Sequence, residues 1–363
     1  MSPGPKIGGA RSLGEARTSH ARTAMLSRRN LLAAAATSLA IPWVSKARAA
    51  DKLTLRLDYT ASGLHAPFYL AIKRGWFDKA GIDLYMEDGN GSSATVKLVG
   101  AGAFDLGLHS LGPLAVARAM KVPVISVAGF VRKGELGFLV PEESGWKTPK
   151  DLIGKKIAYG VASQEGPFVR YFFEQNGVRE DQIELINVDA ASRYAVYFTK
   201  RTDALLTTVP GVMPIAAVRR PSVPIILADF GLNLPGLGMS ARTDTLEKKK
   251  DAIRRCVSVV CGAWAYVLDG HDQEGAEAVF TNRPNGVFSV AMMSEQIRLF
   301  KPFFYTDATK GMPIGMQSEV DWTQTLKSMA DAKAIPPGSR PADYFTNDCI
   351  DRTIVEKVAS ASF

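Results

Sequence analysis

The sequence predicts an α/β protein built from two doubly wound lobes. Residues 53–108 follow the order strand, polar loop, helix, glycine, strand, helix and a final strand that begins with an acidic residue. The same order recurs over residues 156–206. Strands that alternate with helices favour parallel sheets covered by helices. The chain of 363 residues is long enough for two hydrophobic cores, because one domain usually needs about 100 to 200 residues.

The first unit begins with a predicted strand over 53–58, where apolar and polar residues alternate. A helix over 65–77 follows, with Pro67 in its first turn, where a missing N–H costs little. The rest of the unit is expected as strand 82–87, turn 88–91, helix 94–99, strand 104–108, helix 112–120 and strand 122–127.

The second unit begins at Thr148-Pro149-Lys150-Asp151, which is typical of a capped helix start. Its remaining elements are expected as strand 156–160, helix 167–175, strand 183–188, helix 190–200 and strand 203–206. After about residue 246 the pattern predicts long helices, at 248–269, 272–280, 289–300 and 319–332. We expect the tail after Arg352 to be poorly determined.

The positive charge is concentrated at the N-terminus. Residues 1–49 contain eight basic groups and one acid, which accounts for +7 of the formal charge of +8. The remaining chain therefore carries about +1 and has no basic stripe with interleaved aromatic residues. A nucleic-acid-binding function is not expected.

Residues 1–49 are predicted to be an export leader. Ser27-Arg28-Arg29-Asn30-Leu31-Leu32 is a twin-arginine pattern, an apolar run over 31–44 follows, and Ala47-Arg48-Ala49 resembles a cleavage site. The apolar run of about 14 residues is shorter than the roughly 20 that a membrane span needs. A membrane anchor, an ordinary export route and a start at Met25 remain alternatives. The mature protein is expected in the periplasm.

The three cysteines do not suggest a metal site. Cys256 and Cys261 lie five residues apart in a predicted helix, and no CxxC motif occurs. Either could pair with Cys349 in an oxidising compartment, although all three could equally be small buried residues.

Candidate binding residues follow the predicted strands. In open α/β sheets a ligand binds beyond the carboxyl ends of the strands, where polar loops and helix N-termini meet. Two facing lobes would bring such loops together across a mostly apolar cleft. The residues expected there are Asp58, Tyr59, His65, Asn90, Gly91, Ser92, Ser93 and Ser110 of the first unit, and Gln164 and Asp189 of the second.

Several segments in order resemble a known family. They include Leu57-Asp58-Tyr59, His65-Ala66-Pro67-Phe68-Tyr69-Leu70-Ala71, Lys73-Arg74-Gly75-Trp76-Phe77, Gly89-Asn90-Gly91-Ser92-Ser93 and Pro149-Lys150-Asp151-Leu152-Ile153-Gly154-Lys155-Lys156-Ile157. Over roughly residues 53–240 the chain is similar to the solute-binding family related to yeast thiamine-pyrimidine synthase. Wider relatives of that family bind sulfonates, taurine and nitrate.

The resemblance implies the type II periplasmic-binding-protein fold, with two lobes joined by two crossing strands around a ligand cleft. Lobe 1 would comprise residues 50–138 and 236–363, including C-terminal helices that pack mainly on it. Lobe 2 would comprise residues 139–235. By motif position, Asp58, Tyr59, His65 and the turn at 91–93 would line the cleft.

The implied function is a monomeric periplasmic receptor of an ABC importer, without a cofactor. The permease and the ATPase would be separate chains, because the sequence has no GxxxxGK[ST] motif. One alternative is an enzyme on the same scaffold, such as a pyrimidine synthase or a desulfinase-like lyase. The yeast enzyme uses a cysteine-rich iron motif that has no counterpart here. Another alternative is an exported partner of a signalling receptor.

The ligand class is left open by the sequence. Helix N-termini at Ser92 and Ser163 favour an oxyanion such as a sulfonate or carboxylate. Asp58 and Asp189 favour an amine or a ring N–H instead. A small aromatic or heterocyclic molecule with an acidic substituent, pyrimidine-like or sulfonate-like, would satisfy both preferences.

Overall fold

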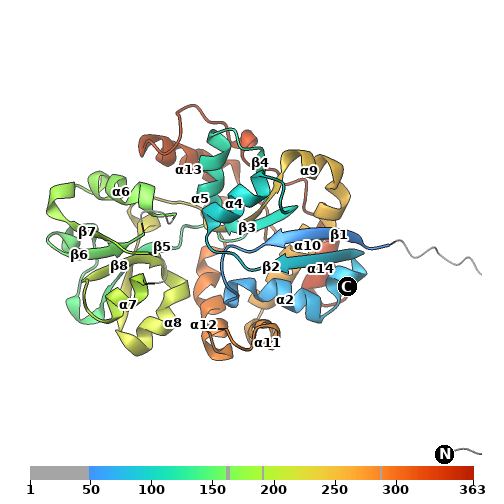
Figure 1. Ribbon diagram of the computed structural model, residues 1–363, viewed down its shortest axis with the longest axis horizontal. Helices are drawn as coiled ribbons and strands as arrows, with labels where there is room; N and C mark the ends of the chain where they lie inside the picture. The colour runs from blue at the N-terminus through green and yellow to red at the C-terminus, as the bar shows by residue number, and fades with distance from the viewer. Residues whose placement is uncertain (1–48, 161–163, 190–191, 287) are drawn as a thin grey trace, which may run out of the picture. The chain divides into compact units, whose positions relative to one another are not determined.

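The computed structural model describes residues 49–160, 164–189, 192–286 and 288–363. The predicted leader lies outside these residues except for Ala49, and so does Ser163. The described chain contains two five-stranded sheets (Figure 1). The first sheet with the helices packed on it is named lobe 1, and the second sheet with its helices is named lobe 2.

The first sheet has the strand order β2-β1-β3-β10-β4. Strand β1 pairs in parallel with β2 and β3, whereas β10 lies antiparallel between β3 and β4. The bounds are β1 (Asp51–Arg56), β2 (Ile82–Glu87), β3 (Leu106–Ser110), β4 (Val124–Gly129) and β10 (Leu237–Arg242).

The second sheet repeats this arrangement as β7-β6-β8-β5-β9. Strand β5 lies antiparallel between β8 and β9, as β10 does in the first sheet. The expectation of parallel sheets is therefore wrong for one strand in each sheet. The bounds are β5 (Leu136–Pro141), β6 (Lys156–Tyr159), β7 (Glu184–Asn187), β8 (Ala204–Thr208) and β9 (Ser222–Ile226).

The chain passes between the sheets twice, at residues 130–135 from β4 to β5 and at residues 227–236 from β9 to β10. The two crossings are hydrogen bonded to each other, since the N–H of Gly236 donates to the carbonyl of Val131 at 2.9 Å. The antiparallel strand of each sheet is the strand that enters from a crossing. Any movement of one lobe against the other must bend these two adjacent segments.

Helices cover both sheets. The predicted helix over 65–77 is interrupted at Gly75, whose φ of +66° ends α2 and precedes α3. The helices packed with the first sheet are α2 (Ala66–Lys73), α3 (Trp76–Lys79), α4 (Ser92–Gly100), α5 (Leu111–Ala119), α9 (Thr243–Lys248), α10 (Lys250–Leu268), α11 (Asp272–Asn282) and α14 (Arg352–Ala359). Those packed with the second are α6 (Val169–Gln175), α7 (Arg193–Phe198) and α8 (Val209–Arg219).

Two C-terminal helices also contact lobe 2. Helix α12 (Val290–Phe300) packs against α8, and α13 (Glu319–Asp331) places Trp322 and Leu326 in a buried cluster that includes Phe138 of β5. These helices therefore hold the lobes together beyond the two crossings.

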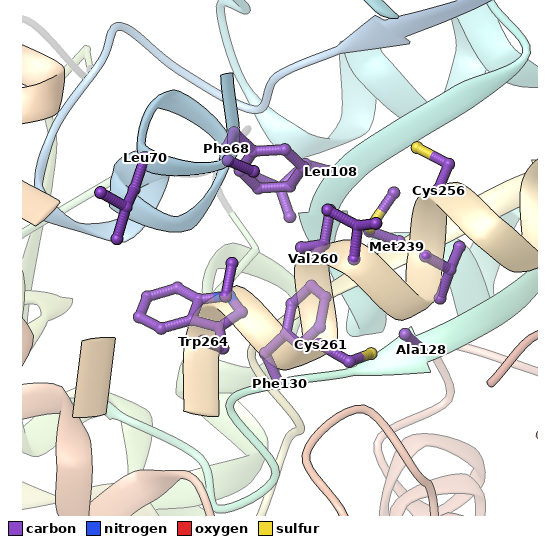
Figure 2. Close-up of a cluster of buried hydrophobic side chains, with 14 of the residues drawn as sticks. Phe68, Leu70, Leu108, Ala128, Phe130, Met239, Cys256, Val260, Cys261 and Trp264 are labelled. Atoms are coloured by element: carbon purple, nitrogen blue, oxygen red, sulfur yellow. The ribbon is translucent and has the colours of Figure 1, made fainter. Parts of the chain in front are cut away.

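Helix α10 lies in the core of lobe 1. Figure 2 shows its residues Cys256, Val260 and Trp264 beside Phe68 of α2 and Met239 of β10. The three cysteines are free and buried. Burial raises the pKa of Cys256 to about 12, so its thiol stays protonated at neutral pH.

The C-terminal segment is better ordered than the sequence suggests. Residues Arg352–Ala359 form α14, which packs on α10 and buries Val355 and Val358. The expectation of a poorly determined tail after Arg352 is wrong, because the apolar face of this short helix completes the core of lobe 1.

Candidate functional site

The loop after β1 holds a buried histidine against an aspartate. His65 is 1% exposed, and its Nδ1 accepts a hydrogen bond from the backbone N–H of Ser62 at 2.9 Å. Since Nδ1 is an acceptor, the proton of a neutral ring is on Nε2, which donates to Oδ1 of Asp58 at 3.0 Å. The pair fixes the ring of His65 and leaves one Asp58 oxygen for other partners.

The turn after β2 packs on the same loop. The N–H of Gly91 donates to the carbonyl of Asp58 at 2.6 Å, and the N–H of Gly89 donates to the carbonyl of Tyr59 at 3.3 Å. A Cβ atom at Gly89 would overlap the carbonyl oxygen of Leu57, so only glycine allows this close approach. The structure thus brings Asp58, Tyr59 and Gly91 together, as expected.

Ser92 links two elements of lobe 1. Its Oγ accepts a hydrogen bond from the N–H of Ser110 at 3.1 Å, which links the start of α4 to the end of β3. Helix α4 begins at Ser92, with Gly91 at its N-cap and no side-chain cap. Ser93 and Asn90 are exposed, and within the described residues no hydrogen bond joins their side chains to the other predicted residues.

Glu135, which the sequence analysis missed, connects the predicted residues of the two lobes. It lies in the first crossing, is 3% exposed, and its carboxyl group accepts a hydrogen bond from the side chain of Gln164 of lobe 2. The carboxyl groups of Asp58 of lobe 1 and Glu165 of lobe 2 act on it electrostatically. Asp58 and Gln164 therefore approach one carboxyl group from opposite lobes.

Burial raises the pKa of Glu135 to about 8. The carboxylates of Asp58 and Glu165 act in the same direction, whereas the hydrogen bonds from its own backbone and from Gln164 act against it. Glu135 is therefore mostly protonated at neutral pH.

Glu165 forms a second buried carboxyl group. It lies next to Gln164, and its Oε1 pairs with Nη1 of Arg193 at 2.5 Å. The two side chains are 2% and 11% exposed. Burial raises the pKa of Glu165, and Arg193 counteracts this shift. No local sequence pattern marks this pair, because the partners lie 28 positions apart in the chain, with α6 and β7 between them.

A second buried histidine, His109, lies in β3 of lobe 1. His109 is fully buried, its Nε2 lies 2.6 Å from the hydroxyl of Ser240, and its Nδ1 lies 2.9 Å from the carbonyl of Ser110. Burial lowers the pKa of His109 to about 4. The ring is thus neutral, with Nδ1–H donating to the carbonyl and Nε2 accepting from the hydroxyl.

Asp189 has a structural role at the start of α7. Its carboxylate accepts a hydrogen bond from the N–H of Ser192 at 3.1 Å, and its carbonyl accepts one from the N–H of Arg193 at 3.1 Å. Asp189 is itself exposed. It orders the segment that carries Arg193.

A hollow of about 1080 Å³ lies beside the crossings. Its walls include Lys133 of the first crossing, Asn233 of the second and Tyr305 of the C-terminal region. None of the ten predicted binding residues lines it. In the described part of the chain, no helix combines the length and the apolarity needed to cross a bilayer.

Comparisons with known proteins agree with the fold. The chain is 27% identical over 140 residues to the formylaminopyrimidine-binding protein of Halalkalibacterium halodurans, a match that spans 39% of this chain and 42% of that protein. It is 24% identical over 344 residues to a binding protein of Brucella abortus, which covers 86% of this chain and 97% of that one.

A shorter match involves an enzyme. The chain is 33% identical over 110 residues to a 4-amino-5-hydroxymethyl-2-methylpyrimidine phosphate synthase of Saccharomyces cerevisiae, covering 30% of this chain and 32% of the synthase. The matched segment thus represents about a third of either protein.

A solved structure shares the architecture. The periplasmic aliphatic sulphonate-binding protein of Escherichia coli superposes with a TM-score of 0.63 at 16% identity, covering 79% of this chain and 94% of that one. The described chain therefore has the periplasmic-binding-protein fold, as the resemblance implied. The family described as NMT1/THI5 like matches residues 63–274, more than half of the chain, and the chain belongs to this family.

Proposed function

We propose that the protein is a periplasmic solute-binding receptor of an ABC importer, which closes its two lobes on a small aromatic or heterocyclic molecule. The observation that carries this proposal is the convergence on Glu135. A residue of lobe 1, a residue of lobe 2 and a carboxyl group of the crossing form one polar cluster. A ligand bound there would contact both lobes and would favour their closed arrangement.

The fold and the relatives support the same proposal. Two crossings joined by hydrogen bonds form a hinge of the kind that permits lobe closure. A relative whose match covers 86% of this chain is named a binding protein. With the leader predicted for residues 1–49, we infer that the protein works outside the cytoplasm and delivers its ligand to a permease and an ATPase on separate chains.

The binding site is proposed to be lined by Glu135 together with Asp58, Tyr59, His65, Gly91, Ser92, Ser110 and Gln164. The Asp58–His65 pair would present one carboxylate oxygen, and Gln164 an amide. Tyr59, which is 45% exposed, would offer a ring on which a flat ligand can stack. Asn90, Ser93 and Asp189 would belong to its outer edge.

An enzyme on the same scaffold is the second candidate, and the yeast synthase match favours it. His65 would be its central residue. The buried cysteines, with their raised pKa values, contribute no nucleophile. Incubation of purified protein with a bound pyrimidine, followed by mass spectrometry, separates the two functions. A receptor returns the molecule unchanged, whereas an enzyme converts it.

The receptor function is tested by a thermal-shift panel of pyrimidines, sulfonates and aromatic acids. A ligand that binds only the folded state raises the melting temperature. Small-angle scattering then compares the protein with and without the best ligand, and closure should reduce the radius of gyration. The Asp58→Asn variant should lose much of the shift. A panel in which no compound stabilises the protein would count against a receptor.

A further inference from the structure

The Glu135 carboxyl group has one oxygen without a partner. Oε2 is buried, and within the described residues no group donates a hydrogen bond to it. The carboxyl also lies so close to Gly236 that a Cβ atom there would overlap it. A buried carboxyl oxygen without a donor costs stability, and such groups are concentrated at functional sites.

The charges around Glu135 are mainly negative. Asp58 faces it from the loop after β1, and Glu165 faces it from the loop after β6. Arg193, a cation beside these carboxyl groups, is paired with Glu165. Nε2 of His65 donates to Asp58 while its Nδ1 accepts from the N–H of Ser62, and His109, near Asp58, is neutral because burial lowers its pKa to about 4. An oxyanion placed here would face the carboxylate of Asp58, which repels it.

We propose that Glu135 determines ligand specificity, and that its carboxyl group binds an edge of the ligand that presents N–H donors, as an amidine or an amino-substituted heterocycle does. This inference rests on the proposed receptor function and decides between the ligand classes that the sequence left open. The N–H groups of the ligand would donate hydrogen bonds to Oε2 of Glu135. A positively charged ligand edge would also offset the negative charge of the nearby carboxylates. Sulfonates and nitrate are disfavoured by the carboxylate of Asp58 and offer no N–H donor to Glu135.

Gln164 controls access to this group. Its side chain is partly exposed and belongs to lobe 2, whereas Glu135 belongs to the crossing. Movement of lobe 2 away from lobe 1 would separate the amide from the carboxyl group and free the oxygen that Gln164 occupies. Closure then places the Gln164 amide and the ligand on the same carboxyl group.

Four probes test the inference by thermal shift and calorimetry: benzamidine and aminopyrimidine as N–H donors, and benzenesulfonate and nitrate as oxyanions. Benzamidine and benzenesulfonate share a ring and differ in the charged group. The N–H probes should bind and the oxyanions should not. Glu135→Gln keeps the side-chain volume and should weaken benzamidine binding at least about 10-fold, because a charge-assisted bond is lost. Glu142→Gln, at an exposed carboxyl group on the surface of lobe 2, should change nothing.

Proton release gives a readout that a merely structural role would not affect. Because the pKa of Glu135 is about 8, a cationic probe that ionises it at pH 7 should release close to one proton. Calorimetry in two buffers of different ionisation enthalpy measures this number. Wild type and Glu142→Gln should release the proton, and Glu135→Gln should not.

Stabilisation by an oxyanion without stabilisation by an N–H probe overturns the inference and leaves the receptor function intact. Unchanged benzamidine binding in Glu135→Gln overturns it as well. If none of the four probes binds, the inference fails, and the wider panel decides separately whether the receptor function stands.

Discussion

Nε2 of Gln296 donates a hydrogen bond to the carbonyl oxygen of Gly211 at 2.9 Å. Oε1 of the same side chain accepts a hydrogen bond from the N–H of Gly63 at 3.1 Å. Gly211 lies in the first turn of α8 in lobe 2, and Gly63 lies in the loop before α2 in lobe 1. One buried amide on α12 therefore joins the lobes, next to the loop that holds Asp58 and His65.

Replacing this amide should destabilise the protein. Gln296→Leu removes both hydrogen bonds and leaves a buried N–H and a carbonyl without their partner, which costs about 1–3 kcal/mol. Chemical denaturation measures the change. Gln273→Leu, at an exposed position of α11, is the matched control and should change the free energy of unfolding by less than about 0.5 kcal/mol. Equal effects of the two substitutions would show that Gln296 does not join the lobes.

The Glu165–Arg193 pair should show the behaviour of a buried ion pair. Arg193→Met leaves the Glu165 carboxyl group buried without its cation and should cost about 3–5 kcal/mol. The double variant Glu165→Gln/Arg193→Met should be more stable than Arg193→Met, because the unpaired charge is removed. Arg179→Met, in an exposed pair with Asp181, should have almost no effect. A double variant no more stable than the single one would contradict the pairing.

Stability should depend on pH through Glu135. Its pKa is about 8 in the folded protein and about 4.5 in the unfolded chain, so the folded state binds the proton more tightly. This tighter proton binding stabilises the folded state. Its contribution to the free energy of unfolding is fully present below about pH 4.5 and is lost as the pH rises through 8. Glu135→Gln cannot lose this proton, so its melting temperature should rise relative to wild type between pH 5 and pH 9. A difference that is constant over this range would contradict the raised pKa.

The close approach at Gly89 should not tolerate a side chain. Gly89→Ala would place Cβ against the carbonyl of Leu57 and should destabilise the protein by about 1–3 kcal/mol. Gly112→Ala is the control, because no atom lies within 4 Å of its Cβ position in α5. That change should be neutral or should stabilise by up to about 1 kcal/mol. Thermal unfolding of both variants compares them, and a stable Gly89→Ala protein would contradict the packing of the turn on the loop.

Local sequence patterns predicted much of the fold. The strand over 82–87 has the predicted bounds, and Thr148 and Asp151 form the expected capping box. Strands β5, β9 and β10 were missed. Leu136–Pro141 is buried at every position, so it lacks the alternation that marks a half-exposed strand. Its antiparallel place between β8 and β9 also depends on the path of the crossing, which no local pattern reports.

The candidate site was only partly predictable for the same reason. Asp58 and His65 are seven residues apart and share a loop, so their proximity follows from the local sequence. Glu135 follows Arg132-Lys133-Gly134 and precedes an apolar strand, and no motif in this segment indicates a binding residue. Its importance comes from burial in a crossing and from partners at Asp58 and Gln164, which only the folded chain supplies. A lone acidic residue directly before a wholly apolar strand was the available signal.

The most direct test of the account is a crystal structure of the protein with an N–H-donor ligand from the probe set. The account predicts ligand density within hydrogen-bond distance of Glu135, with Asp58 of lobe 1 and Gln164 of lobe 2 on either side. Density in the hollow lined by Lys133 and Tyr305, with Glu135 and Gln164 still hydrogen bonded to each other, would contradict it.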